Sequence, residues 1–362
     1  MSERPTRRQF VQAALAAPAL LSLARRGGAR PAGSAPIKVG QIGTKHAHAD
    51  GHMRTLLKYP EHFEVVGVVE PDPAQREREG REKPYRGQRW LTEEELLATP
   101  GLEAVAVETE VRDLVPTAQR CLDSGRHVHL DKPAGESLPP LEKLHATAAG
   151  KGLTIQMGYM YRYNPAFRFL FQAVRDGWLG DVFEIDTVMS KTVSAESRRG
   201  LAEYAGGSMF ELGCHVIDPL LHIMGPPDRV TGYPRHTRPR QDGLADNGLA
   251  VLEYPRATAT VRSAVIEVDG GKRRQFVVCG DQGTIVIRPL EPPRLELTLS
   301  APRGGFAKGT QVVDLPEAPG RYDGIWLDFA RVIRGEKAHD FSSEHDLAVQ
   351  RTLLAACQLP VE

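Results

Sequence analysis

Two stretches of the chain carry side chains that could move protons. Lys132 comes at the end of a short apolar run and is followed directly by a proline. Farther on, Glu211, His215 and Asp218 stand at positions i, i+4 and i+7, so all three line one face of a helix. Burial can lower the pKa of a lysine towards neutrality, and histidine already titrates there. These residue types suit the removal of a proton from an alcohol whose hydride leaves for an acceptor.

A glycine-containing turn near residue 40 indicates what the acceptor would be. Residues 40–48 read GQIGTKHAH and follow an apolar β-branched run, where a first strand turns into a first helix. A glycine there lets backbone N–H groups approach a pyrophosphate, whose charge the helix N-terminus favours. The usual dinucleotide fingerprint, begun at Gly43, would place glycine where Lys45 and His48 stand. The motif alone is therefore weak, although Lys45 offers a charge to the phosphate instead.

Glu70 strengthens the interpretation as a dinucleotide site. It ends the second apolar run, where an acidic side chain accepts hydrogen bonds from the adenosine ribose. A carboxylate there repels a 2′-phosphate, and no Lys or Arg follows until Arg76, which favours NAD over NADP. The alternative is a solvated turn residue before Pro71. The residues expected to contact the cofactor are Gly43, Thr44, Lys45, His46, Glu70, Thr109 and Lys132.

Three histidines in the same turn permit a different interpretation. His46, His48 and His52 are closely spaced, and a His-x-His pair after a strand binds zinc in some hydrolases. No nearby cysteine or glutamate completes an obvious ligand set in the sequence. We therefore expect these histidines to contact the cofactor or solvent, and we expect no metal.

The first half of the chain alternates strands with helices, as a parallel sheet covered on both faces requires. The expected strands are Ile37–Ile42, Val65–Val69, Ala104–Val107, His127–Leu130 and Leu153–Met157. Between them we expect helices ending near Lys58 and Ala98, over Leu114–Leu122, and over about Leu138–Ala149. The helix that ends near Ala98 opens with a capping box, Thr92 to Glu95. The pattern predicts an α/β domain with a doubly wound, Rossmann-type parallel sheet.

Beyond Met157 the pattern changes to strands that follow one another without intervening helices. The expected strands are Val182–Met189, Ala250–Tyr254, Ala257–Val268, Gln275–Cys279, Thr284–Arg288 and Leu295–Leu299. The expected helices are Pro165–Val174, Met209–Ile223, Gly324–Val332 and Glu344–Cys357. The sequence thus predicts a C-terminal α+β domain with a mostly antiparallel, open sheet.

The first 35 residues differ from both domains. Paired arginines at positions 7 and 8 precede an apolar stretch from Val11 to Leu23 and a segment of small residues. This order is typical of a twin-arginine export signal, which carries folded proteins out of the cytoplasm; a marginal amphipathic helix is the alternative. We assign residues 1–35 to signal and linker, 36–157 to the Rossmann domain and 158–362 to the substrate and oligomerisation domain. A periplasmic or otherwise exported protein is expected, or a cytoplasmic one where the signal is not functional.

Composition excludes several partners. Lys plus Arg equals Asp plus Glu, at 46 each, so a nucleic-acid partner, which requires a basic surface, is not expected. After the signal no apolar run is long enough to span a bilayer, so no membrane partner is expected beyond the export signal. The four cysteines are widely scattered and favour buried small side chains over disulfides or a zinc site.

Taken together, these motifs resemble those of the Gfo/Idh/MocA oxidoreductases, relatives of glucose–fructose oxidoreductase and inositol dehydrogenase. Asp131-Lys132-Pro133 matches the family's Glu-Lys-Pro, with aspartate for glutamate. The run from Gly206 to Asp218 matches its Gly-Gly-x-x-x-acid-x-Gly-x-His-x-x-Asp motif, with Glu211 for the usual aspartate. The resemblance covers the chain from about Ile37 onward.

The resemblance implies that Lys132 and His215 lie beside a substrate hydroxyl, with Glu211 nearby. We expect His215 to accept the proton and Lys132 to assist it or to orient the substrate, and the reverse assignment stays open. Asp218 is expected to be structural, bonded to the backbone or an arginine. The residues expected to bind substrate are Arg162, Tyr163 and Asn164.

We expect an NAD(P)-dependent oxidoreductase that acts on a hydroxyl or carbonyl of a sugar or polyol. NAD is the favoured cofactor, and we expect it to stay bound between turnovers. We also expect a homo-oligomer, either a dimer or a tetramer. Two alternatives stay open. Some family members cleave glycosides by transient oxidation, elimination and re-reduction with bound NAD. A third possibility is a dinucleotide-binding sensor without turnover, because the fingerprint is altered.

Overall fold

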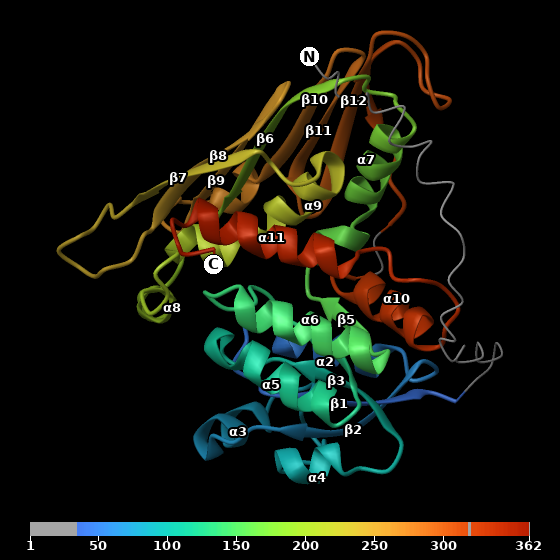
Figure 1. Ribbon diagram of the computed structural model, residues 1–362, viewed down its shortest axis with the longest axis vertical. Coiled ribbons are helices and arrows are strands. Elements are labelled where there is room, and N and C mark those ends of the chain that lie inside the picture. Colours follow the sequence, from blue (N-terminus) through green and yellow to red (C-terminus); the bar gives the residue numbers. More distant parts are fainter. Residues whose placement is uncertain (1–34, 318–319, 362) are drawn as a thin grey trace, which may run out of the picture.

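The computed structural model describes residues 35–317 and 320–361, which form two sheets with their helices (Figure 1). The first sheet is parallel throughout, with strand order β2-β1-β3-β4-β5. Its strands are β1 (Ile37–Ile42), β2 (Phe63–Val69), β3 (Leu102–Val107), β4 (His127–Leu130) and β5 (Ile155–Met157). Most of their side chains are buried on both faces, as the apolar runs predicted. The doubly wound α/β domain expected from the sequence is confirmed.

Helices cover this sheet: α2 (Ala49–Lys58), α3 (Pro73–Glu79), α4 (Glu93–Leu97), α5 (Val111–Asp123) and α6 (Pro139–Lys151). Helices α5 and α6 pack side by side (Figure 1). The capping box at α4 is present, since Thr92 accepts from the Glu95 N–H and Glu95 from the Thr92 N–H. Helix α3 was not expected, although Asp72 caps it and Pro73 opens it.

The second sheet has eight strands in the order β13-β12-β11-β10-β6-β9-β8-β7. All neighbours are antiparallel except β6 and β9. The strands are β6 (Val182–Ser190), β7 (Arg229–Arg235), β8 (Asn247–Tyr254), β9 (Ala257–Ala264), β10 (Gln275–Gly280), β11 (Gly283–Leu290), β12 (Pro293–Leu299) and β13 (Gly309–Val313). The expected open, mostly antiparallel sheet is confirmed, and the two edge strands β7 and β13 are additions to it.

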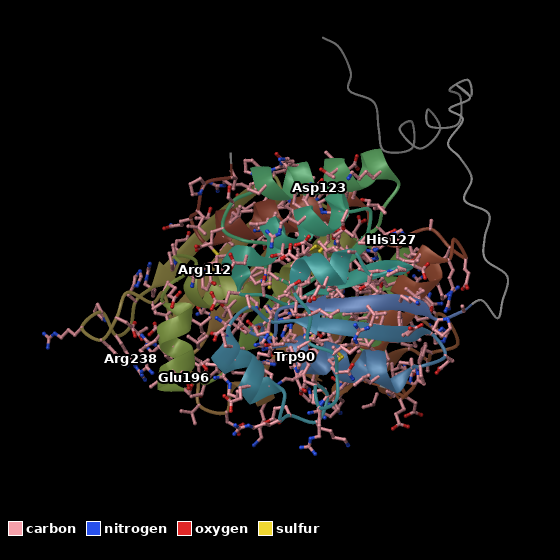
Figure 2. All side chains as sticks on the ribbon, turned by 90° about the horizontal axis from the view of Figure 1, so that it is seen from below. Trp90, Arg112, Asp123, His127, Glu196 and Arg238 are labelled. Atoms are coloured by element: carbon pink, nitrogen blue, oxygen red, sulfur yellow. The ribbon has the colours of Figure 1, made fainter. Side chains whose placement is uncertain are left out.

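Helices α7 (Pro165–Arg175), α9 (Cys214–Met224) and α11 (Ser343–Ala356) lie together along the second sheet (Figure 1). Side chains alternate along its strands between fully buried, such as Phe276 and Val278, and half-buried, such as Val277. One face therefore packs against the helices, and the other stays open among the described residues. The loop after β7, which carries Arg238, projects from the body of the molecule (Figure 2).

The helix expected over 209–223 is two elements. A π-helical turn, η2 (Met209–Gly213), leads directly into α9. Glu211 lies in this wider turn, whereas the i, i+4 spacing to His215 assumed a regular α-helix. A short helix, α8 (Ala195–Leu201), is not among the helices expected from the sequence. The remaining short helices are the 3₁₀ turns η1 (Met160–Tyr163) and η3 (Gly270–Arg273).

The last part of the chain returns to the first domain. Helix α10 (Asp323–Ile333) packs against α2. The indole N–H of Trp326 donates to Nδ1 of His52 at 3.0 Å, and Asp323 accepts from Lys58 and Tyr59. The two domains are thus joined both by the chain at Met157 and by α10.

The expected signal, residues 1–35, lies outside the described residues apart from Ala35. Within the described part, no helix is both long and apolar enough to cross a membrane. All four cysteines are free, and three of them are buried, as the sequence indicated.

Candidate active site

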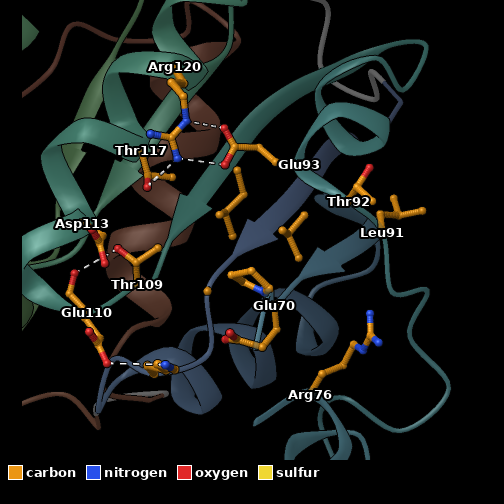
Figure 3. A pocket seen from close by; sticks show the side chains of 15 residues that line it. Glu70, Arg76, Leu91, Thr92, Glu93, Thr109, Glu110, Asp113, Thr117 and Arg120 are labelled. Atoms are coloured by element: carbon orange, nitrogen blue, oxygen red, sulfur yellow. Dashed lines mark hydrogen bonds and ion pairs between the residues drawn. The ribbon is translucent and has the colours of Figure 1, made fainter. Parts of the chain in front are cut away.

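A cavity of about 430 Å³ opens at the carboxyl edge of the parallel sheet (Figure 3). Its wall combines Gly43 after β1, Glu70 after β2 and Thr109 after β3. Ligands of open α/β sheets bind at this edge. Arg76 also lines the cavity (Figure 3), so a positive charge stands near Glu70.

Gly43 lies in the turn after β1 and has a backbone conformation that favours glycine. Its φ is +89°, a left-handed conformation that side chains other than glycine rarely adopt. A Cβ at this position would lie 2.6 Å from the backbone N of Thr109, so there is room only for a bare backbone. A close approach of this kind is what a dinucleotide phosphate needs, so the turn fits a dinucleotide.

Glu70 holds the glycine turn in place. One carboxylate oxygen accepts from the backbone N–H of Thr44 at 3.0 Å and from its hydroxyl at 2.8 Å. The other accepts from the backbone N–H of Asp72 at 3.1 Å. Each carboxylate oxygen can accept two hydrogen bonds, so capacity for ribose hydroxyls remains beside these contacts. Glu70 is therefore more than the solvated turn residue of the alternative interpretation.

Lys45 stands at the mouth of the cavity. Its ammonium lies 3.3 Å from Asp72 and 3.5 Å from Glu110. Although partial burial acts to lower the pKa of Lys45, its hydrogen bond to Asp72 and the charge of Glu110 raise it. The lysine is thus a fixed positive charge next to the turn.

A second cavity, of about 280 Å³, lies between the two domains. Residues 45–47 and 109–112 line it from the first domain, and Lys191, Tyr204 and Glu211 from the second. Arg112 pairs with Glu203 across its rim. Figure 2 shows Arg112 on the side of the first domain that faces α8, which carries Glu196. Of the expected proton-transfer residues, Glu211 lines this cavity, and Lys132 contacts Glu211.

Lys132, Glu211 and Lys191 form one charged group there. The Lys132 ammonium donates to the backbone carbonyl of Glu211 at 3.1 Å and lies 3.7 Å from its carboxylate. Lys191 contacts the same carboxylate at 3.1 Å. Burial acts to lower the pKa of Lys132, but the charge of Glu211 outweighs it, so the pKa is raised. The lowered lysine pKa expected from the sequence is therefore wrong, and Lys132 stays protonated.

His215 has the opposite character. It lies in the first turn of α9 and is 3% exposed. Burial, together with the charges of Lys132 and His48, holds its pKa well below the usual range. The imidazole of His215 is therefore neutral, whereas the ammonium of Lys132 is charged.

The three residues expected to bind substrate occupy structural positions. Arg162 is fully buried and binds Asp218 at 2.7 Å and Asp346 at 2.5 Å. Tyr163 donates to Asp328, and Asn164 caps α7. None of the three lines the cavity between the domains. Arg162 keeps one unpartnered nitrogen, Nη1, and Tyr163 and Asn164 line a separate cavity, so the substrate role of the three stays a prediction. The expected structural role of Asp218 is confirmed by its bond to Arg162.

Sequence reasoning missed a buried cluster of acids and histidines behind Lys132. Asp131 contacts His46 and His48, and Glu108 lies near His52 and His129. Both acids are fully buried. Their position at the carboxyl ends of β3 and β4 was the available signal, since parallel strands bring such ends together.

A parallel sheet with a glycine turn at its carboxyl edge, joined to an open second sheet, defines a two-domain dinucleotide-binding architecture. A family model described as "Oxidoreductase family, NAD-binding Rossmann fold" matches residues 37–159, and one described as "GFO/IDH/MocA C-terminal domain" matches residues 167–286. The chain belongs to the Gfo/Idh/MocA family of oxidoreductases, as its motifs indicated.

Relatives of known sequence include the uncharacterized oxidoreductase YhhX of Escherichia coli, 27% identical over 60% of this chain and 63% of YhhX. The chain thus matches less than two thirds of the length of YhhX. D-xylose 1-dehydrogenase (NADP(+)) 2 of Haloferax volcanii is 26% identical over 72% of this chain and 78% of its own. An aldose-aldose oxidoreductase from Caulobacter crescentus, complexed with glycerol, shares the fold with a TM-score of 0.75 at 19% identity, covering 89% of this chain and 98% of that one.

Proposed function

We propose that this protein is an NAD(P)-dependent oxidoreductase that oxidises a hydroxyl, or reduces a carbonyl, of a sugar or polyol. The observation that carries the proposal is Glu211, which lines the cavity between the dinucleotide turn and the second domain and contacts the charged Lys132. Neutral His215 follows Glu211 four residues later, at the start of α9. The sugar dehydrogenase and the aldose-aldose oxidoreductase among the similar proteins support the substrate class.

Each side chain has a role that follows from its protonation. His215 accepts the hydroxyl proton as the alcohol is oxidised, and the Lys132 ammonium donates a hydrogen bond to the same oxygen as it gains negative charge. Glu211 holds the ammonium between its carbonyl and its carboxylate. The nicotinamide, when bound, supplies the hydride acceptor. Reduction of a carbonyl runs the same transfers in reverse.

The cofactor we propose is NAD, bound by Gly43, Thr44 and Glu70 and retained through the catalytic cycle. Glu70 places a carboxylate where NADP has its 2′-phosphate, although Arg76 in the same wall reduces the discrimination. We further propose export by the twin-arginine route. Little free NAD is available outside the cytoplasm, so a cofactor that dissociated after each turnover would be lost.

The test is to purify the mature protein without added cofactor, dialyse it, and identify the dinucleotide released on denaturation by mass spectrometry. The same protein is then screened against a sugar and polyol panel by NADH absorbance. Bound dinucleotide together with sugar-dependent reduction supports the proposal. Release of a reducing sugar without net NADH would indicate the glycosidase instead, and tight binding without turnover would indicate the sensor.

A further inference from the structure

The carboxylate of Asp131 stands between two histidine rings at the back of the cavity between the domains. Its Oδ2 lies 2.7 Å from Nδ1 of His46 and 3.0 Å from Nδ1 of His48. Asp131 is fully buried and His46 nearly so, while the His48 side chain keeps 12% of its surface exposed. The two rings and the carboxylate therefore converge on one point that is accessible past His48.

The contact between His46 and Asp131 requires a cation. Nε2 of His46 lies 3.0 Å from the backbone carbonyl of Lys132, which can only accept, so Nε2 carries the hydrogen. The other nitrogen, Nδ1, accepts from the backbone N–H of His48 at 3.3 Å. In the neutral ring, a lone pair on Nδ1 then faces a carboxylate oxygen at 2.7 Å. Only a proton or a metal ion between these atoms makes the contact favourable.

A second buried carboxylate lies beside the first with no donor to satisfy it. Glu108 is fully buried, and neither of its oxygens has a hydrogen-bond partner. One of them lies 3.7 Å from Nδ1 of His46. A buried carboxylate without a partner is costly, and a neighbouring cation would offset that cost.

His52 also lies beside the two carboxylates, but its ring nitrogens are not free to bind a metal ion. The Trp326 indole can only donate, so its bond to Nδ1 of His52 leaves the ring hydrogen of His52 on Nε2. That nitrogen points towards Asp131 at 3.6 Å and Glu108 at 3.9 Å. The ring N–H of His52 thus faces the two carboxylates without a hydrogen bond to either.

We propose that Nδ1 of His46, Nδ1 of His48 and the Asp131 carboxylate bind a divalent first-row transition metal ion, with Glu108 as a further oxygen ligand. Two histidines and a carboxylate are a known ligand set for such ions. In an octahedral site with bonds of about 2.1 Å, adjacent ligand atoms lie about 3.0 Å apart, close to the two distances to Asp131. The bond from His46 to the Lys132 carbonyl is the outer contact that orients a metal-bound histidine. The proposal replaces the metal-free site expected from the sequence, and it does not depend on the proposed dehydrogenase activity.

The experiment strips the purified mature protein with a chelator, dialyses it, and titrates it separately with Zn²⁺, Mn²⁺ and Co²⁺. Stoichiometry is read by elemental mass spectrometry, and Co²⁺ geometry by visible absorption. The test variants are the double change His46→Gln/His48→Gln and the single change Asp131→Asn. His236→Gln, at an exposed histidine, is the control. Circular dichroism and the midpoint of thermal unfolding establish that each variant is folded.

We expect one equivalent of at least one of the three ions in the wild type and the control, and affinity at least tenfold weaker in both test variants. Failure of all three ions to bind the wild type would overturn the proposal, and a proton would then occupy the His46–Asp131 contact. Equal metal affinity in the folded double variant would overturn it as well. Turnover with the sugar panel is scored separately, so failure of the metal site and failure of the proposed activity are distinguishable.

Discussion

Lys132 illustrates how a single neighbour decides what a buried side chain can do. Burial alone would lower the pKa of this lysine, but the nearby carboxylate of Glu211 raises it, so the lysine stays protonated. The same lysine then helps to keep His215 neutral. The lysine and the histidine are thus held in opposite protonation states, which is the condition for one to donate and the other to accept.

Replacing either member of this pair should reduce turnover far more than it reduces cofactor binding. Lys132→Ala or His215→Ala is expected to lower kcat by roughly 10²–10⁴, the range for loss of a positioned acid or base. Steady-state kinetics on the substrate found in the sugar panel provide the measurement. Lys143→Ala, at an exposed lysine of α6, is the control. Near-wild-type kcat in both test variants would remove the proposed site.

Glu70 should determine the choice of dinucleotide. Glu70→Ser removes the acceptor for the ribose and releases the bonds to Thr44, so NAD should bind roughly 10–100-fold more weakly, as expected for loss of hydrogen bonds to a charged group. Binding of NADP should improve, because the repulsion of its phosphate is gone. Equilibrium titration with both dinucleotides measures this, with Glu64→Ser on the same strand as control. Unchanged affinities for both would limit Glu70 to a turn role.

Among single residues, the sequence predicted those that belong to a recognisable motif. It missed those that reach the site only because distant parts of the chain pack together. Gly43, Glu70 and Glu211 line the two cavities, and Lys132 contacts Glu211. The role of Glu108 could not be inferred, because its neighbours are distant in sequence and only the parallel strands bring them together. The two buried partners of Arg162 could not be inferred either, because both are distant from it in sequence.

Among the helices, Arg162 joins three elements that are distant in sequence. It lies in η1, while its partners Asp218 and Asp346 lie in α9 and α11. His345 also contacts Asp218, at 2.9 Å. The charge of Arg162 outweighs burial and lowers the pKa of Asp218. This network fixes α9 relative to η1 and α11 within the second domain.

Breaking the network should destabilise the fold without altering the cavity. Asp218→Asn leaves a buried guanidinium with one partner fewer, and the free energy of unfolding should fall by about 3 kcal/mol. Urea denaturation measures this. Glu142→Gln, which breaks an exposed pair with Arg351, should cost under about 1 kcal/mol. Equal stability of the two variants would contradict the structural role of Asp218.

The same residue gives the wild type a pH dependence. Because the folded pKa of Asp218 is lowered, its contribution is fully present above the ordinary aspartate value of about 4 and is lost as the pH falls through the lower folded value. Asp218→Asn should therefore show a shallower loss of stability at acidic pH than the wild type.

Elements with strong periodicity were predicted and marginal ones were not. Every strand of the parallel sheet was found within two residues at each end, since both faces are apolar. Strands β7 and β13 lie at the sheet edges, where exposed polar residues remove the alternation. The π-helical turn at η2 could not be predicted from the spacing of apolar residues. One extra residue in a single turn leaves the segment as apolar as an ordinary α-helix would be.

Over the whole molecule, the open face of the eight-stranded sheet is a regular surface that the described helices leave uncovered. A row of half-buried or exposed residues crosses it in register: Val251, Thr260, Asp186, Val277, Val286, Glu296 and Val312. Valines at four of the seven positions make the row more apolar than a solvated sheet face requires. We infer that a second copy of the chain covers it, which agrees with the homo-oligomer expected from the sequence.

Light scattering on the purified protein should therefore give the mass of a dimer or tetramer. The double change Val251→Lys/Val277→Lys places two charges in the row and should yield monomers. Val268→Lys, at a valine that is 87% exposed elsewhere, should leave the assembly unchanged. A monomeric wild type at micromolar concentration would contradict this use of the sheet.

Helix α10 has a consequence for the order in which the molecule is built. Lys58 of α2 and Asp323 of α10 are 265 residues apart in the chain, yet they contact each other. A ribosome adding about 5–20 residues per second needs roughly 13–53 s to cover that interval. Throughout this time the surface of α2 that carries His52 has emerged without Trp326 to cover it. The first domain to be synthesised is thus completed only by one of the last helices to leave the ribosome.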